Sequence, residues 1–117
     1  MITIQYDTTN DRNFSFLFDK KAYIPPSFYV KFPGKPELEF YKAIMDRHPK
    51  VRYVSEETID YSIYCTYAID QKEFVIVADE DYDLVYFSTE SQNRSPIAEY
   101  LCHIIERHHA KSHFDLQ

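Results

Sequence analysis

Residues 59–89 read IDYSIYCTYAIDQKEFVIVADEDYDLVYFST, and this stretch decides the fold. Apolar and polar residues alternate strictly over 59–69, which is the period of a strand with one buried face. Residues 74–78 are apolar at every position, as in a central strand covered on both faces, and 84–89 form a further candidate strand. The links between these segments are short and polar, so the pattern predicts hairpins and an antiparallel sheet.

The predicted hairpin turns contain aspartate where many proteins have glycine. The chain has a single glycine, Gly34, whereas average usage of roughly 7% would give about eight. We therefore expect aspartates at the turns to provide side-chain hydrogen bonds and any left-handed backbone geometry. The same scarcity excludes a phosphate-binding P-loop and a dinucleotide fingerprint, because both need several glycines.

Weaker signals surround this stretch. Short strands are expected at residues 2–6, 14–18, 28–32 (an edge strand) and 51–54. Pro36 fits the first turn of a helix that Pro49 ends, and Ser95 fits the N-cap of a second helix with an apolar stripe. The sequence thus predicts one α+β domain over residues 1–117. It would contain an antiparallel sheet of about five to seven strands, with two helices (about 36–48 and 95–112) packed on one face.

Charge is distributed unevenly along the chain, whose formal net charge is −6. Residues 51–90 contain ten Asp/Glu and two Lys/Arg, whereas residues 1–50 contain six and eight. A net acidic chain is a poor general binder of nucleic acid, so we expect no direct nucleic-acid partner. No apolar run approaches about 18 residues and no signal-peptide pattern is present, which favours a reduced, cytoplasmic protein without a membrane partner.

The acidic segment also contains tyrosines, and together they indicate a protein-binding surface. Antiparallel hairpins bring their ends together, so the Glu56-Glu57 corner and the 79–83 turn can share one edge of the sheet. Exposed tyrosine is a frequent hot-spot residue, and carboxylates complement a basic partner. The candidate partner-binding residues are Asp79, Glu80, Asp81, Tyr82, Asp83, Glu56, Glu57, Asp60 and Tyr64. The alternative is a solvated acidic face that aids solubility; for Tyr61, Tyr67 and Tyr86 we favour core or cross-strand packing.

Other candidate sites are weaker. Glu106, His109 and His113 share one helical face at a spacing that could hold zinc, although cations near a helix C-terminus also complement its dipole. Cys65 and Cys102 have no metal-type spacing and are expected to be small core residues. We find no catalytic signature and expect neither an enzyme nor a cofactor. Five phenylalanines could exceed what one core buries, leaving a structural or oligomerisation role open: Phe14, Phe16, Phe18, Phe28 and Phe32.

In size, charge and expected architecture, the chain resembles the small acidic bacterial immunity proteins of contact-dependent growth inhibition and related polymorphic toxin systems. The resemblance is carried by the Glu56–Asp60 corner and the Asp79-Glu80-Asp81-Tyr82-Asp83 turn, without a diagnostic motif. It implies a non-enzymatic, cytoplasmic inhibitor that binds one cognate toxin domain, very often a basic nuclease, and occludes its active site. Two alternatives stay open: a phage-type DNA mimic with carboxylates spread along a face, and a zinc-dependent enzyme using the C-terminal histidines.

Overall fold

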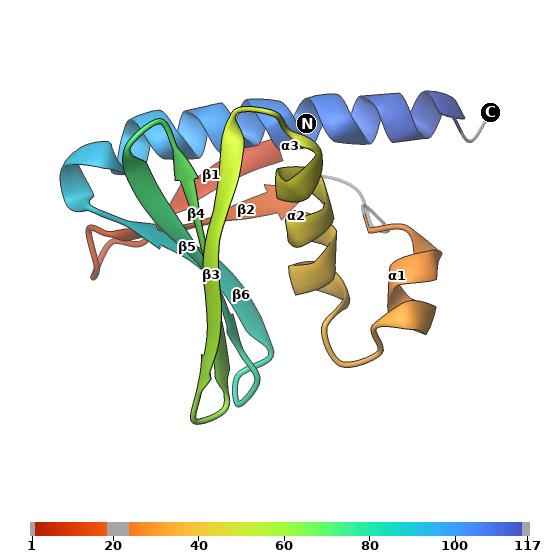
Figure 1. Ribbon diagram of the computed structural model, residues 1–117, viewed down its shortest axis with the longest axis horizontal. Coiled ribbons are helices and arrows are strands. Elements are labelled where there is room, and N and C mark those ends of the chain that lie inside the picture. The colour runs from red at the N-terminus through yellow and green to blue at the C-terminus, as the bar shows by residue number, and fades with distance from the viewer. Residues whose placement is uncertain (1, 19–23, 116–117) are drawn as a thin grey trace.

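Six strands and four helical segments make up the computed structural model, which describes residues 2–18 and 24–115 and, within the last helix, side chains as far as residue 108 (Figure 1). In chain order the elements are β1 (Ile2–Tyr6), β2 (Asn13–Phe18), α1 (Pro26–Lys31), α2 (Pro36–Arg47), β3 (Val51–Ile59), β4 (Ser62–Ile69), β5 (Lys72–Asp79), β6 (Leu84–Thr89), the 3-10 turn η1 (Ser91–Asn93) and α3 (Arg94–Asp115).

The strands form one open antiparallel sheet in the order β1-β2-β6-β5-β4-β3. Strands β3 to β6 are consecutive hairpins, and β1-β2 is a further hairpin that joins β6 through β2. This arrangement confirms the predicted α+β class with an antiparallel sheet. Strand β3 forms one edge of the sheet, so the acidic segment occupies this edge strand and the next three strands of the sheet, β4, β5 and β6.

The core lies between the sheet and the helices α2 and α3. Aromatic rings from both sides meet there: Tyr41 of α2 packs edge-on against Phe87 of β6 with a centroid separation of 5.0 Å. Phe14 stacks on Phe87 from the neighbouring strand at 5.3 Å. Both Phe14 and Phe87 are fully buried, whereas Ser15 and Ser88, which point to the other face, are only half-buried. The sheet therefore has a helix-covered face and an outer face.

The strict alternation over residues 59–69 predicted a single strand, and this prediction is wrong. Strand β3 runs to Ile59, a two-residue turn follows at Asp60 and Tyr61, and β4 begins at Ser62. The alternation continued through the turn because Ile59 and Tyr61 are apolar although both are exposed. The predicted strand at 51–54 is correspondingly longer, and residues 56–57 lie within a strand and not at a corner.

The predicted edge strand at 28–32 is also wrong, because these residues belong to helix α1 and its C-cap. Pro26 occupies the first turn of α1, where its missing N–H is not needed. Helical spacing then places Phe28 beside Phe32, and Phe28 packs edge-on against Phe40 of α2 at 6.0 Å. All five phenylalanines named above are at least half-buried, so they leave no exposed phenylalanine patch.

The start of helix α3 and the backbone geometry of three turns also bear on the sequence predictions. Helix α3 begins at Arg94 after a 3-10 turn, so the predicted N-cap at Ser95 is wrong, and this residue lies inside the first turn of the helix. Left-handed backbone geometry occurs at Asp60, Asp70 and Asp83, with φ of 55°, 57° and 50°, as the glycine-poor turns predicted. Within the described ranges no helix is both long and apolar enough to cross a membrane.

Candidate protein-binding site

The β3–β4 and β5–β6 turns lie side by side at one end of the sheet, the lower end in Figure 1. The backbone N–H of Glu80 donates a hydrogen bond to the carbonyl of Tyr61 at 3.0 Å, which joins the two turns directly. We call the joined turns, residues 60–61 and 79–83, the acidic tip. The hairpins thus bring Asp60 to the 79–83 segment, whereas Glu56 and Glu57, the residues expected at this corner, lie farther back within β3.

Aspartates shape the acidic tip as well as charging it. Asp60 and Asp83 each adopt the left-handed conformation that their turns require, at lower cost than most residues would incur. The Oδ1 atom of Asp79 accepts a hydrogen bond from the backbone N–H of Asp81 at 3.1 Å. These local bonds set the backbone of the tip, and they leave the side chain of Asp81 exposed to solvent.

The negative charge of the acidic tip is largely uncompensated. Within the described part of the chain, the one base that pairs with a tip carboxylate is Lys35, whose Nζ lies 3.7 Å from Glu80. Both side chains are 45% exposed, and an ion pair this exposed contributes little. Glu37, in the first turn of α2, adds to the charge: burial raises its pKa, and the nearby carboxylate of Asp83 raises it further. The carboxylates of Glu37 and Asp83 therefore repel each other at the margin of the tip.

Large apolar and aromatic side chains are exposed among these charges. Tyr82 is 79% exposed and Tyr61 is 67% exposed, while Ile59 and Leu84, which flank the turns, are each 50% exposed. The prediction that Tyr61 packs in the core or across strands is wrong, because the residue lies in the turn. Exposed tyrosine beside carboxylates combines contact area with charge, which is the composition of a binding surface.

A row of side chains on the outer face continues the site toward the middle of the sheet. Glu57, Tyr64, Val77 and Tyr86 lie in register across β3, β4, β5 and β6. Val77 is only 3% exposed although no described helix covers it, which places it beneath its two tyrosine neighbours. Burial raises the pKa of Tyr86, and Tyr64 and Asp79 raise it further. The predicted cross-strand position of Tyr86 is confirmed, and Tyr64 lies on the same outer face.

Glu56 is separated from the other candidate residues, because it points toward the helices. Its Oε1 accepts hydrogen bonds from Lys42 Nζ at 2.6 Å and from Cys65 Sγ at 3.1 Å. The bond from Lys42 and then that from Cys65 hold the pKa of Glu56 below its usual value. Burial, followed by the contact with Glu56, raises the pKa of the Cys65 thiol to about 12, so this thiol is unreactive. Glu56 therefore attaches α2 to the edge strand.

The C-terminal histidines provide no described metal site. Among the described residues no group of three or more His, Cys, Asp or Glu side chains is close enough to hold a metal ion. Glu106 accepts a hydrogen bond from the backbone N–H of Ile2 at 2.9 Å, which ties α3 to β1. The side chains of His109 and His113 lie outside the described residues. His108 packs edge-on against Phe40 at 6.2 Å, which places it on the side of α3 that faces α2.

Sequence reasoning missed four members of this surface: Glu37, Ile59, Leu84 and Val77. Ile59 and Leu84 carried a usable signal, since they border a turn rich in charge. Glu37 carried none, because only the packing of the α1–α2 loop brings it to Asp83. The assembled surface offers many hydrogen-bond acceptors and exposed phenol rings, which suits a partner rich in Lys and Arg. A scan against protein-family models, a search of curated proteins and a search of solved structures each found no match.

Proposed function

We propose that this protein is a non-enzymatic inhibitor of the immunity-protein type, which binds a cognate basic toxin domain of the nuclease class and occludes its active site. The observation that carries the proposal is the acidic tip. It gathers five carboxylates and two highly exposed tyrosines on two joined turns, with one weak ion pair from the described residues. Such a surface opposes folding through repulsion, and a basic partner would relieve that repulsion.

The shape and chemistry of the acidic tip support occlusion of a nuclease site. Nucleases contact phosphates through Lys and Arg, and carboxylates can occupy the same positive groups. The two hairpin ends extend beyond the helices (Figure 1), so a partner can reach them without disturbing the core. Tyr82 and Tyr61 would supply the apolar anchors, and the outer-face residues Glu57 and Tyr64 would extend the contact.

A DNA mimic receives less support from the same surface. Mimicry of a duplex requires carboxylates spaced along a long face, following the phosphates. Here the charges are concentrated at one end of the sheet, and Thr66, Val75 and Ser88 separate them from the far end of the outer face. Inhibition of one basic protein site is therefore the better match to this distribution.

The proposal is tested with charge-matched variants against a candidate toxin domain, to be sought first among the products of the neighbouring genes. The double reversal Glu57→Lys with Asp81→Lys changes the acidic tip and its adjoining row. The control, Glu73→Lys with Glu99→Lys, makes the same change in net charge at exposed positions outside the acidic tip. Each protein is co-expressed with the toxin domain while growth is followed, and nuclease activity is measured in vitro at increasing inhibitor concentration.

We expect the wild type and the control pair to protect cells and to inhibit the nuclease stoichiometrically. The tip pair should lose protection, with an inhibition constant at least 100-fold higher, because reversal both removes contacts and adds repulsion. Circular dichroism would verify that both pairs fold. Equal protection by the tip pair would contradict the proposed interface, and failure of the wild type to inhibit would contradict the proposed function.

A further inference from the structure

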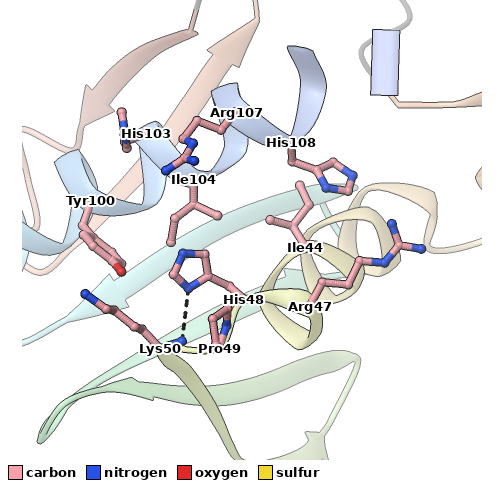
Figure 2. A pocket seen from close by; sticks show the side chains of 10 residues that line it. All are labelled: Ile44, Arg47, His48, Pro49, Lys50, Tyr100, His103, Ile104, Arg107 and His108. Carbon is pink, nitrogen blue, oxygen red and sulfur yellow. Dashed lines mark hydrogen bonds between the residues drawn. The ribbon is translucent and has the colours of Figure 1, made fainter. Parts of the chain in front are cut away.

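A basic groove lies between the end of α2 and the middle of α3 (Figure 2), at the opposite end of β3 from the acidic tip. We define this basic groove by His48, Lys50, Tyr100 and Arg107, which line it together with His103 and Ile104. Its volume is about 710 Å³, within the range of small-molecule sites. No acidic residue of the described chain lines it, although the protein as a whole is acidic.

His48 occupies the centre of the groove in a fixed orientation. Its Nδ1 atom accepts a hydrogen bond from the backbone N–H of Lys50 at 3.3 Å, and Tyr100 packs edge-on against the ring at 5.9 Å. The bond to Nδ1 assigns the proton of neutral His48 to Nε2. Figure 2 shows that the ring side opposite this bond faces α3, so Nε2 can donate to a ligand in the groove.

The positive charges around His48 are available to a ligand. Within the described part of the chain, neither Lys50 nor Arg107 forms an ion pair. Burial lowers the pKa of His48, and the charges of Lys50 and Arg107 lower it further. The two cations thus flank one point, the His48 ring, and Figure 2 shows Lys50 and Arg107 on different sides of it. Arg47, at the last turn of α2, points away from this point (Figure 2) and is explained by the helix dipole.

We propose that the basic groove binds a small phosphorylated molecule with an aromatic body, of the class of the nucleoside monophosphates. The phosphoryl group would accept hydrogen bonds from His48 Nε2, Lys50 and Arg107, whose guanidinium suits bidentate contact. Tyr100 and Ile104 would supply apolar surface for the aromatic part. The net negative charge of the chain does not prevent this, because salt screens interactions beyond about 10 Å at 0.1 M. The proposal is independent of the toxin partner.

The test uses the full chain, with AMP, inorganic phosphate, adenosine and a single-stranded DNA oligonucleotide as separate probes. Calorimetry gives each affinity, and NMR follows the imidazole signals of His48. We expect AMP to saturate the site, phosphate to bind the same residues at least tenfold more weakly, and adenosine to bind more weakly still. The pKa of His48 should rise when AMP binds, because the anion offsets Lys50 and Arg107.

Variants separate the groove from general electrostatics. Lys50→Gln and Arg107→Gln should each weaken AMP binding about tenfold, since each removes a charge-assisted hydrogen bond. Arg52→Gln, which removes an exposed cation from β3, should leave the affinity unchanged within about twofold. All three positions are exposed, so the variants should fold.

Four results would overturn the proposal. AMP could fail to saturate at about 10 mM, a concentration far above that of a specific site. Arg52→Gln could weaken AMP binding as much as the groove variants do. Phosphate could bind as tightly as AMP, which would remove the aromatic part of the ligand. The oligonucleotide could bind far more tightly than AMP with a steep salt dependence, which would assign the groove to nucleic acid.

Discussion

The acidic tip and the basic groove lie at opposite ends of strand β3. They differ in how far apart in the sequence their residues lie. β3 begins directly after Lys50 of the groove and, nine residues later, ends directly before Asp60 of the tip. The tip comes from turns within one short, acidic segment, whereas the groove joins residues 48–50 to α3 about 50 positions away. A net charge of −6 therefore conceals two surfaces of opposite sign.

The largest expected effect is a cross-over between these two surfaces. The tip pair Glu57→Lys with Asp81→Lys should raise the Kd for the toxin domain at least 100-fold and leave AMP binding within about threefold. The groove pair Lys50→Gln with Arg107→Gln should do the reverse. Calorimetry with both ligands on both variants measures the cross-over. Loss of both activities in either variant would show that the two surfaces are not independent.

The next effect concerns the aromatic anchors of the tip. Tyr82→Ala should raise the toxin Kd about 30-fold, equivalent to about 2 kcal/mol, as truncation of an interface hot spot does. Tyr53→Ala is the matched control, because Tyr53 is also highly exposed but lies near the start of β3, the end opposite the tip. Surface plasmon resonance on both variants provides the comparison. Equal affinities for the two variants would show that tyrosine at the tip is not an anchor.

Glu56 and Glu57 are neighbours on opposite faces of the sheet, and replacing them should affect the stability of the protein differently. Glu56→Gln should lower the free energy of unfolding by about 1 kcal/mol at pH 7, because it weakens charge-assisted bonds that are partly screened by solvent. Glu57→Gln should change it by less than about 0.5 kcal/mol. Urea denaturation of both variants measures this difference.

The pH dependence of the Glu56 effect has a defined sign. The pKa of Glu56 is lowered in the folded state, so its contribution is present above the unfolded pKa and is lost as the pH falls through the folded pKa. The gap between wild type and Glu56→Gln should therefore close in acid. A gap that is constant down to acid pH would show that the loss comes from packing and not from ionisation.

The smallest expected effect is a gain in stability, opposite in sign to that of Glu56→Gln, and it concerns Glu37 at the margin of the tip. The pKa of Glu37 is raised in the folded state by burial and by Asp83, so ionised Glu37 is destabilising. Glu37→Gln should stabilise the protein at pH 7 by up to about 1 kcal/mol, and the gain should vanish as the pH falls through the pKa of Glu37. Thermal unfolding across pH tests this; a loss of stability at neutral pH would contradict the repulsion.

The difference between the two surfaces also explains what the sequence could predict. The sheet, both long helices and the aspartate turns were predictable because period and turn chemistry are local signals. The turn at Asp60 that separates β3 from β4 was not predictable. Ile59 and Tyr61 are exposed, yet they continue the alternation that is typical of a strand with one buried face. Helix α1 was missed because aromatic, strand-forming residues become helical when Phe28 packs on Phe40.

The candidate site was predicted in part for the same reason. Residues 79–83 and Asp60 were identified from charge, since they are close in sequence and remain close in the fold. The direction of Glu56 depended on the β3 register and on Lys42, which no local pattern reveals. The basic groove could not be predicted from the sequence, because its residues from the end of α2 and from α3 come together only when the two helices pack.

The central claim, that the acidic tip recruits a basic protein partner, is tested most directly by the salt dependence of association. The association rate constant for the isolated toxin domain is measured by stopped flow at about 50 mM and about 500 mM NaCl. The account predicts a fall of at least tenfold for the wild type and a much smaller one for Glu57→Lys with Asp81→Lys. A wild-type rate constant that is the same at both salt concentrations would contradict it.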